Sequence, residues 1–417
     1  MSGNQDRRGA FEHCFGGLAA IGRDPGGGWT RLAWTEEDRA ARAWFEAQAA
    51  DRGLTVERDS AGNLWAWWGG PSTDAGAEGQ VVAVGSHLDT VRGGGAYDGA
   101  LGVVSALLAV GELIMRGVEP RRPLAVVAFA DEEGGRFGVP LFGSRVLTGA
   151  LAPADLLERV DEHGTSVAGA LAAAGIDPEG FGPDPARVGR LAAFVELHVE
   201  QGRGLADLGQ PVALATAMWP HGRWRLTLSG EANHAGTTRL ADRRDPMLGL
   251  AAAVLAARAA ATELEAVATV GRVLVEPNSA NSVPERVSAW LDARSGEDQR
   301  LDWLLAAFEA AVEDAAGRNG LTAELAGESR SPGVEFDRAL TDRLDARLRA
   351  SGLEPPRLPT AAGHDAGALA AAAVPTAMLF VRNPTGTSHS PAETAEVDDC
   401  LVGVEALAAV IEELACR

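Results

Sequence analysis

The sequence predicts an α/β protein with a mainly parallel sheet, interrupted by a smaller α+β domain. Three apolar runs, at residues 81–84, 124–130 and 191–197, look like buried strands, and polar residues that can bind a ligand lie at or just after the end of each. Helical stretches separate them, as in a parallel α/β sheet. Later the order becomes strand-helix-strand-strand-helix-strand, as in a split-βαβ sandwich. We therefore expect a main domain over 1–208 and 328–417, with an inserted domain over 209–327.

Composition supports this organisation and excludes several classes of protein. A chain of 417 residues that is 46% hydrophobic can build two domains with sizeable cores. Its formal net charge of −21 argues against nucleic acid as a partner. No run approaches 18 apolar residues and the first 25 residues lack a secretory signal, so we expect no membrane partner and a cytoplasmic location. The three cysteines show no C-x-x-C spacing, which excludes a disulfide scaffold and a thiolate zinc site.

In the first segment, residues 36–52 have helical periodicity, and residues 54–68 read as two strands around a hairpin-like turn. The strand at 81–84 leads into His87 and a glycine-rich turn that ends at Asp98. An apolar helix follows over 101–116.

In the inserted segment, apolar and polar residues alternate over 212–230, which predicts one half-exposed antiparallel strand. A helix is expected over 245–262, with Pro246 in its first turn. The other elements expected in this segment are strands at 266–275, 285–294 and 321–326 and a helix at 297–318. In the main domain that follows, we expect helices at 336–351 and 396–415 and a strand at 374–381.

Four of the eight histidines lie beside predicted strand ends of the main domain: His87, His198, His364 and His389. One histidine in such a place is usually structural, but four together with nearby carboxylates indicate a metal centre. Imidazole and carboxylate ligands suit Zn²⁺, Mn²⁺, Co²⁺ or Ni²⁺. Two ions with a bridging carboxylate need about five ligands. The chain can supply them from His87, Asp98, Glu133, His198 and His389, which leaves Glu132 free as a general base.

Other chemistries find little support in the sequence. The G-x-S-x-G elbow of serine hydrolases and the phosphate-binding G-x-x-x-x-G-K-[ST] loop are both absent. The run Gly93–Gly95 lacks the spacing of a dinucleotide-binding loop.

Six motifs occur in a characteristic order: GSHLDTVRGGGAYDGALGV, FADEEGGRFG, ELHVEQG, NHAGTT, AGHDAG and TSHSPAE. Together they resemble the dinuclear-metal amidohydrolases related to aminoacylases and carboxypeptidases. Within that family the chain is similar to the branch of N-carbamoyl-L-amino-acid hydrolases, β-ureidopropionases and allantoate amidohydrolases. The resemblance implies a zinc-aminopeptidase-like three-layer α/β/α catalytic domain. It also implies an inserted ferredoxin-like domain that acts in dimerisation and as a lid, so we expect a homodimer.

The resemblance also implies roles for individual residues. Two divalent ions per subunit would be bound by His87 and His198, by Glu133 and His389, and by Asp98 as the bridge. Glu132 would be the general base, and Asp89 would orient His87. His364 and Asp365 would support these ligands from behind without touching a metal ion.

The substrate-binding residues implied by the resemblance come from both domains. Gln201 would contact the ureido end of the substrate, and His234 would stabilise the oxyanion, in relatives from the partner subunit. Asn281 and Arg294 would hold the substrate carboxylate, since the planar fork of arginine binds carboxylates bidentately. Gly363 would offer backbone contacts nearby.

We therefore expect an amidohydrolase that cleaves the C–N bond of a ureido or N-carbamoyl group on a small carboxylate. Allantoate is the first choice and an N-carbamoyl-L-amino acid the second. An aminoacylase or dipeptidase with the same two-metal site is the alternative, and a binding module that has lost catalysis is another. After NHAGTT the chain has Arg239-Leu240 where many relatives have Pro-Met, so the lip of the site differs there.

Overall fold

The computed structural model describes residues 2–70 and 81–417. The chain forms two compact units. The first comprises Met1–Thr216, Glu335–Leu358 and Gly363–Arg417, and the second comprises Ala217–Val334 and Pro359–Ala362. The sequence placed the insertion at 209–327, a few residues earlier at both ends.

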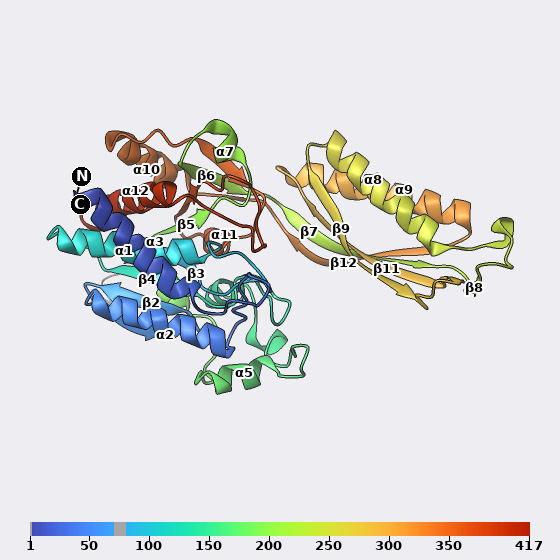
Figure 1. Cartoon of the computed structure of the whole chain (residues 1–417), viewed down its shortest axis with the longest axis horizontal. Coiled ribbons are helices and arrows are strands. Elements are labelled where there is room, and N and C mark those ends of the chain that lie inside the picture. Colours follow the sequence, from blue (N-terminus) through green and yellow to red (C-terminus); the bar gives the residue numbers. More distant parts are fainter. Residues whose placement is uncertain (1, 71–80) are drawn as a thin grey trace. The chain divides into compact units, whose positions relative to one another are not determined.

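The first unit is built on a nine-stranded sheet with the order β1-β2-β4-β3-β5-β15-β6-β13, with β14 also paired to β6 (Figure 1). The strands are β1 (Thr55–Arg58), β2 (Leu64–Trp68), β3 (Val81–His87), β4 (Leu124–Phe129), β5 (Leu191–Val199), β6 (Val212–Met218), β13 (Val334–Glu335), β14 (Arg357–Thr360) and β15 (Thr376–Val381). The four central strands, β4, β3, β5 and β15, run parallel. Strands β3, β4 and β15 are buried along their whole length, as expected of apolar strands covered on both faces.

Helices cover both faces of this sheet and enclose two separate apolar cores. One core is closed by α1 (Ser2–Ala19), α2 (Glu36–Asp51), α3 (Ala100–Met115), α10 (Arg338–Ala350) and α12 (Val397–Ala415). The other is closed by α4 (Phe142–Leu147), α5 (Val167–Ala173), α11 (Asp365–Ala371) and the short α6 (Pro185–Gly189) and α7 (Gly204–Leu208). The predicted three-layer α/β/α fold is confirmed.

The second unit is a four-stranded antiparallel sheet in the order β12-β7-β11-β9, with two helices on one face (Figure 1). Its main elements are β7 (His221–Ser229), α8 (Pro246–Glu263), β9 (Val267–Glu276), β11 (Arg286–Arg294), α9 (Asp298–Asn319) and β12 (Thr322–Ser331). Burial alternates along β7 and β11, so their apolar side chains pack under α8 and α9 and their polar side chains lie on the opposite face. A small strand pair, β8 (Asn233–His234) and β10 (Ser282–Val283), adjoins this sheet.

One expectation about secondary structure was wrong. Residues 212–230 form two strands rather than one, because Pro220 lies between them and cannot donate to a ladder. The first of them, β6, joins the large sheet beside β15 and is mostly buried. No prediction was made for residues 2–19, where α1 forms. Among the described residues, none of the helices combines the length and the apolar character that crossing a membrane requires.

Candidate metal centre and active site

The expected ligands gather at one edge of the large sheet, where its parallel strands end. His87 is the last residue of β3, and Glu132 and Glu133 follow β4. His198 lies near the end of β5, and His389 lies in the loop after β15. Because these four strands are adjacent and parallel, their carboxyl ends meet at the same edge, which is where α/β sheets form their sites.

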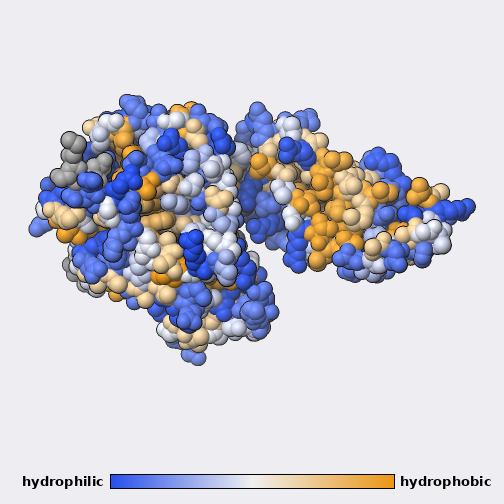
Figure 2. Space-filling view, in the orientation of Figure 1, coloured by the Kyte–Doolittle hydropathy of each residue, from blue (hydrophilic) through white to orange (hydrophobic). Residues whose placement is uncertain are grey.

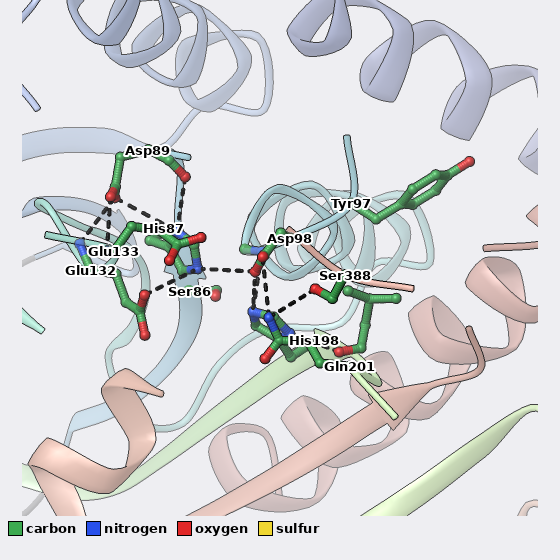
Figure 3. Close-up of polar contacts among 12 residues, drawn as sticks. Ser86, His87, Asp89, Tyr97, Asp98, Glu132, Glu133, His198, Gln201 and Ser388 are labelled. Atoms are coloured by element: carbon green, nitrogen blue, oxygen red, sulfur yellow. Dashed lines mark hydrogen bonds and ion pairs between the residues drawn. The ribbon is translucent and has the colours of Figure 1, made fainter. Parts of the chain in front are cut away.

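Asp98 belongs to two groups of possible metal ligands and gives one carboxylate oxygen to each. Figure 3 shows the contacts of Asp98 with His87 and His198. Its Oδ1 is 3.7 Å from Nε2 of His87 and 3.2 Å from Nε2 of His198. Its Oδ2 is 3.3 Å from Nε2 of His389, which is itself 3.5 Å from Oε1 of Glu133. The structure thus brings the five expected ligands together as two sets of three that share Asp98.

The loop that carries Asp98 depends on Gly99. This glycine has a φ of 64°, and a Cβ at this position would lie 2.4 Å from the imidazole of His87. Only glycine combines this left-handed conformation with so close an approach. Gly99, which directly follows the turn noticed in the sequence, therefore allows Asp98 and His87 to share one site.

Hydrogen bonds fix the tautomers of the two buried histidines. Nδ1 of His87 is 3.0 Å from the backbone oxygen of Asp89, and Nδ1 of His198 is 2.8 Å from the backbone oxygen of Val199. In the neutral rings, each Nδ1 therefore donates its proton to a carbonyl and leaves the lone pair of Nε2 directed at Asp98. This is the arrangement that a metal-binding histidine needs.

Asp89 was expected to orient His87 through its carboxylate. Its Oδ1 lies 3.6 Å from Nδ1 of His87, farther than its own backbone oxygen. The carboxylate instead accepts the backbone N–H groups of Glu132 and Glu133, each at 3.1 Å. Asp89 therefore ties the loop after β3 to the loop after β4.

The site concentrates negative charge away from water. Burial raises the pKa of Glu132 well above its usual value, although His87 opposes the shift. Burial and repulsion from Asp98 raise the pKa of Glu133 to about 7. Burial would also raise the pKa of Asp98, but the neighbouring imidazoles of His198 and His389, when protonated, outweigh this effect and hold the pKa well below its usual value. Divalent cations would offset this crowding of carboxylates.

The donor set fits divalent metal ions. The buried Oε1 of Glu133 has no hydrogen-bond partner among the described residues, and it belongs to one of the two ligand sets. A buried carboxylate oxygen without a partner is costly unless an ion occupies the space beside it. A third possible set, Glu196, His198 and His364, is less suited. The oxygens of Glu196 already accept Ser86 Oγ at 2.7 Å and the Ala366 N–H at 2.8 Å.

Several other expected residues surround this centre within the first unit. Nε2 of Gln201 donates to Oδ2 of Asp98 at 3.2 Å and lies 3.4 Å from Nε2 of His389. The ring of His364 packs edge-on against His198 with 4.5 Å between centroids. Asp365 is buried and accepts the Ser144 hydroxyl at 2.5 Å. Gly363 directly precedes His364, at the start of the chain segment that re-enters the first unit.

The remaining expected residues belong to the second unit. His234 in β8 is exposed and pairs with Ser282 of β10, and the Ala235 N–H donates to the Asn281 carbonyl. Nδ1 of His234 accepts the N–H groups of Gly236 and Thr237, so in the neutral ring Nε2 carries the proton. Its Nε2–H is therefore available to donate to a substrate oxygen.

Arg294 lies at the other end of the second unit's sheet from His234. It is the last residue of β11, whereas β8 and β10 lie beyond the first residue of β11, Arg286 (Figure 1). Eight residue steps along a strand correspond to roughly 26 Å. The second unit therefore holds His234 and Asn281 together and keeps Arg294 far from both.

Sequence reasoning did not identify Glu393, although it ends the TSHSPAE motif. This buried carboxylate accepts the backbone N–H groups of Tyr97 and Asp98 at 3.1 and 2.9 Å. It also accepts the Ser388 hydroxyl at 2.8 Å. Glu393 thus ties the loop of Asp98 to the loop of His389. The acidic residue in the motif was the available signal, but its partners lie 295 residues away in sequence.

Comparisons with known proteins find relatives over nearly the whole chain. Residues 83–413 match the family described as peptidase family M20/M25/M40. The chain is 37% identical to an N-carbamoyl-L-amino acid amidohydrolase of Geobacillus stearothermophilus over 95% of this chain and 96% of that protein. It is 32% identical to an allantoate amidohydrolase of Bacillus subtilis over 95% of each chain. A hydantoinase/carbamoylase family amidase of Burkholderia vietnamiensis superimposes with a TM-score of 0.86 at 31% identity, covering 99% of this chain and 98% of the other.

Proposed function

Since the chain belongs to peptidase family M20/M25/M40, we propose that it is a two-metal amidohydrolase for small ureido carboxylates. It would cleave the C–N bond of a ureido or N-carbamoyl group. The observation that carries this proposal is the pair of ligand sets that share Asp98, with the carboxylate of Glu132 3.9 Å from His87. The names of the relatives, which include N-carbamoyl-L-amino acid and allantoate amidohydrolases, support this type of bond as the target.

His87 and His198 would hold one divalent ion, Glu133 and His389 the other, and Asp98 would bridge them. Zn²⁺, Mn²⁺, Co²⁺ and Ni²⁺ all suit this mixture of imidazole and carboxylate. When bound, such ions lower the pKa of water and polarise a carbonyl group. Gln201, which already contacts Asp98 and His389, would stand at the ureido end of the substrate.

Glu132 would act as the general base. It would take a proton from the attacking water and pass it to the nitrogen that leaves. The carboxylate of Glu132 is buried and lies 3.9 Å from His87, so it is placed to hold that proton between the two transfers. If a free carbamoyl group is released, the resulting carbamate decomposes to carbon dioxide and ammonia.

Residues of the second unit would bind and activate the rest of the substrate. Arg294 and Asn281 would hold the substrate carboxylate, with the backbone of Gly363 nearby. The protonated Nε2 of His234 would donate to the oxygen of the scissile carbonyl as negative charge develops there.

The separation of these residues supports a homodimer. A small substrate cannot span the roughly 26 Å of β11 that separates Arg294 from the end near His234 and Asn281. Because the resemblance places His234 in the site of the partner subunit, we assign His234 and Asn281 to that site and Arg294 to the site of its own chain. Each site would then be complete only in the dimer.

The second unit also has an apolar surface that a partner subunit would cover (Figure 2). Leu248 and Leu255 of α8 are 55% and 71% exposed, and Val267 of the edge strand β9 is 49% exposed. Apolar patches and long uncovered edge strands are aggregation hazards in a monomer. We propose that α8 and β9 form the homodimer interface.

Allantoate and N-carbamoyl-L-amino acids remain the two candidate substrates. Allantoate is supported by FADEEGGRFG followed by GSRVLTGAL, and by FVRNPTGTSHSPAE, which resemble the allantoate branch slightly more closely. The 37% identity with the Geobacillus N-carbamoyl-L-amino acid enzyme favours the second candidate. The two differ in bulk around the carbon that bears the carboxylate, so the same metal centre can serve either.

The test is a substrate panel on metal-reconstituted protein, with ammonia release and amine release measured in parallel. It contains allantoate, β-ureidopropionate, N-carbamoyl-L- and D-amino acids, N-acetyl-amino acids and dipeptides. We expect a ureido acid to give the highest kcat/KM. Faster cleavage of a dipeptide or an N-acetyl-amino acid would replace this proposal with the aminoacylase or dipeptidase alternative. No turnover of any substrate with both ions bound would favour a non-catalytic binding module.

A further inference from the structure

The guanidinium of Arg294 is held by two partners within the second unit. Its Nε and Nη2 donate to Oδ1 and Oδ2 of Asp292 at 3.0 and 3.4 Å. Its Nη1 donates to the backbone oxygen of Ala361 at 2.7 Å. Arginine has five N–H donors, so one on Nη1 and one on Nη2 remain without a partner among the described residues. Such a pair can bind both oxygens of a carboxylate.

Asp292 is shared with a second arginine. Its Oδ2 accepts Nε of Arg223 at 3.2 Å, and Arg223 lies directly opposite Asp292 in the pairing of β7 with β11. Burial alone would raise the pKa of Asp292, but Arg294 and then Arg223 outweigh it and hold this pKa below its usual value. The carboxylate therefore stays ionised at neutral pH and holds its two arginines on the same face of the sheet.

The charge balance explains why two arginines are useful. With Asp292 as its only partner, Arg294 would be neutralised and would attract a substrate anion weakly. Arg223 is the third charge, so the group of Arg223, Asp292 and Arg294 keeps one net positive charge. In the next row of the same face, Arg225 pairs with Glu328 and Arg272 lies over the ring of Trp290. These two rows are therefore locally positive on a chain with a formal net charge of −21.

We propose that Asp292 is a positioning residue that presents Arg294 to the carboxylate of the substrate, and that Arg223 preserves the positive charge which this presentation needs. The proposal rests on the proposed function, because it takes the ligand of Arg294 to be the substrate carboxylate. Asp292 and Arg223 would thus influence how well Arg294 binds the substrate without touching the substrate themselves. Pre-orientation of this kind reduces the rotamer entropy that Arg294 would otherwise lose on binding.

The test uses the metal-loaded enzyme with allantoate or N-carbamoyl-L-alanine, whichever it hydrolyses faster, and with the carboxamide analogue of that substrate. In Asp292→Asn we expect KM for the carboxylate to rise about tenfold, because Arg294 loses the partner that orients it and this loss outweighs the added positive charge. The value of kcat should stay within about twofold, since the lost interaction concerns binding only. KM for the carboxamide should not change. Asp292→Glu should recover part of the loss, and Arg223→Gln should raise KM about threefold with the same pattern.

Glu328→Gln is the matched control, since Glu328 pairs with Arg225 and with Nε1 of Trp290 on the same face. It should leave both KM values unchanged. Melting temperatures show whether each variant is folded. If Asp292→Asn does not fold, Arg223→Gln tests the proposal instead, because Arg223 is 55% exposed and its replacement should not disturb the fold.

Equal changes for carboxylate and carboxamide in Asp292→Asn would overturn the proposal, because they would indicate a general structural role. The proposal would also be overturned if Arg294→Gln raised KM for the carboxylate but Asp292→Asn left this KM unchanged. The proposed function would still stand in that case. If Arg294→Gln itself does not discriminate between the two substrates, the assignment of Arg294 to the substrate carboxylate fails as well.

Discussion

At the scale of single residues, the sequence was most informative about the candidate metal ligands. The clustering of His87, Asp98 and His198 could be predicted, because each lies near a strand end or in the loop that follows a strand. Their mutual geometry could not be predicted. That each oxygen of Asp98 belongs to a different ligand set follows from how the glycine-rich loop folds back at Gly99.

Glu132→Gln should abolish most turnover without removing the metal ions. A glutamine cannot accept the proton of the attacking water, so kcat should fall by about 10²- to 10⁴-fold. Steady-state kinetics and metal content by mass spectrometry measure the two effects. Glu179→Gln, at an exposed position of the same unit, is the control and should behave as wild type. Near-normal turnover in Glu132→Gln at full metal content would contradict the assigned base.

Glu393 shows what a single sequence hides at this scale. Its role depends on two loops that are distant in sequence and adjacent in space, and its own motif does not reveal the partner loop. Glu393→Ala should weaken metal binding by about 10- to 100-fold, because the loops of Asp98 and His389 lose their common partner. A competition titration with a chromogenic chelator measures the affinity. The exposed Glu396→Ala is the control, and equal affinities in the two variants would remove Glu393 from the site.

At the scale of elements, periodicity predicted the strands well where burial was uniform, as in β3 and β4. It failed for β6, whose partner in the sheet, β15, is more than 150 residues away in sequence. It also missed α1, which contains four glycines and has low helix propensity. Packing of Phe11, Cys14 and Leu18 against the core stabilises this helix instead.

Gly85 within β3 should be indispensable for the fold. Its φ is 154°, and a Cβ here would lie 2.0 Å from the backbone oxygen of Val127, its partner in β4. Gly85→Ala should therefore cost about 3 kcal/mol or more, or prevent folding, because two central strands would have to separate. Urea denaturation measures the free energy of unfolding.

The control for this change is Gly317→Ala in α9, where no atom lies within 4 Å of an added Cβ. Alanine in an exposed helix position should stabilise the protein by about 0.5–1 kcal/mol. If Gly85→Ala is as stable as wild type, the close pairing of β3 and β4 at this point would be in doubt.

At the scale of the whole molecule, the order of motifs predicted which candidate residues lie in each domain. The resemblance implied a role in the partner subunit for His234 but not for Asn281 or Arg294. How far Arg294 lies from His234 and Asn281 depends on the length of β11, which could be judged only once the strand pairing was known.

Leu255→Asp should convert the proposed dimer to a monomer. This side chain is 71% exposed on α8, and a buried, unpaired carboxylate in an apolar interface costs several kcal/mol. Light scattering coupled to size-exclusion chromatography measures the mass. Leu208→Asp, in which a 53% exposed leucine of the first unit is changed, should leave the mass unchanged. A monomer that retains full activity would contradict the shared active site.

The separation of His234 and Arg294 along β11 has one further consequence, which concerns mixtures of inactive proteins. Glu132→Gln and His234→Ala should each be nearly inactive as pure dimers. In a hybrid dimer, one site would combine the intact Glu132 of one chain with the intact His234 of the other, and the second site would carry both defects. Random exchange of subunits makes half of the dimers hybrids, so about a quarter of wild-type activity should return on mixing. No recovery after verified exchange would mean that each chain uses its own His234.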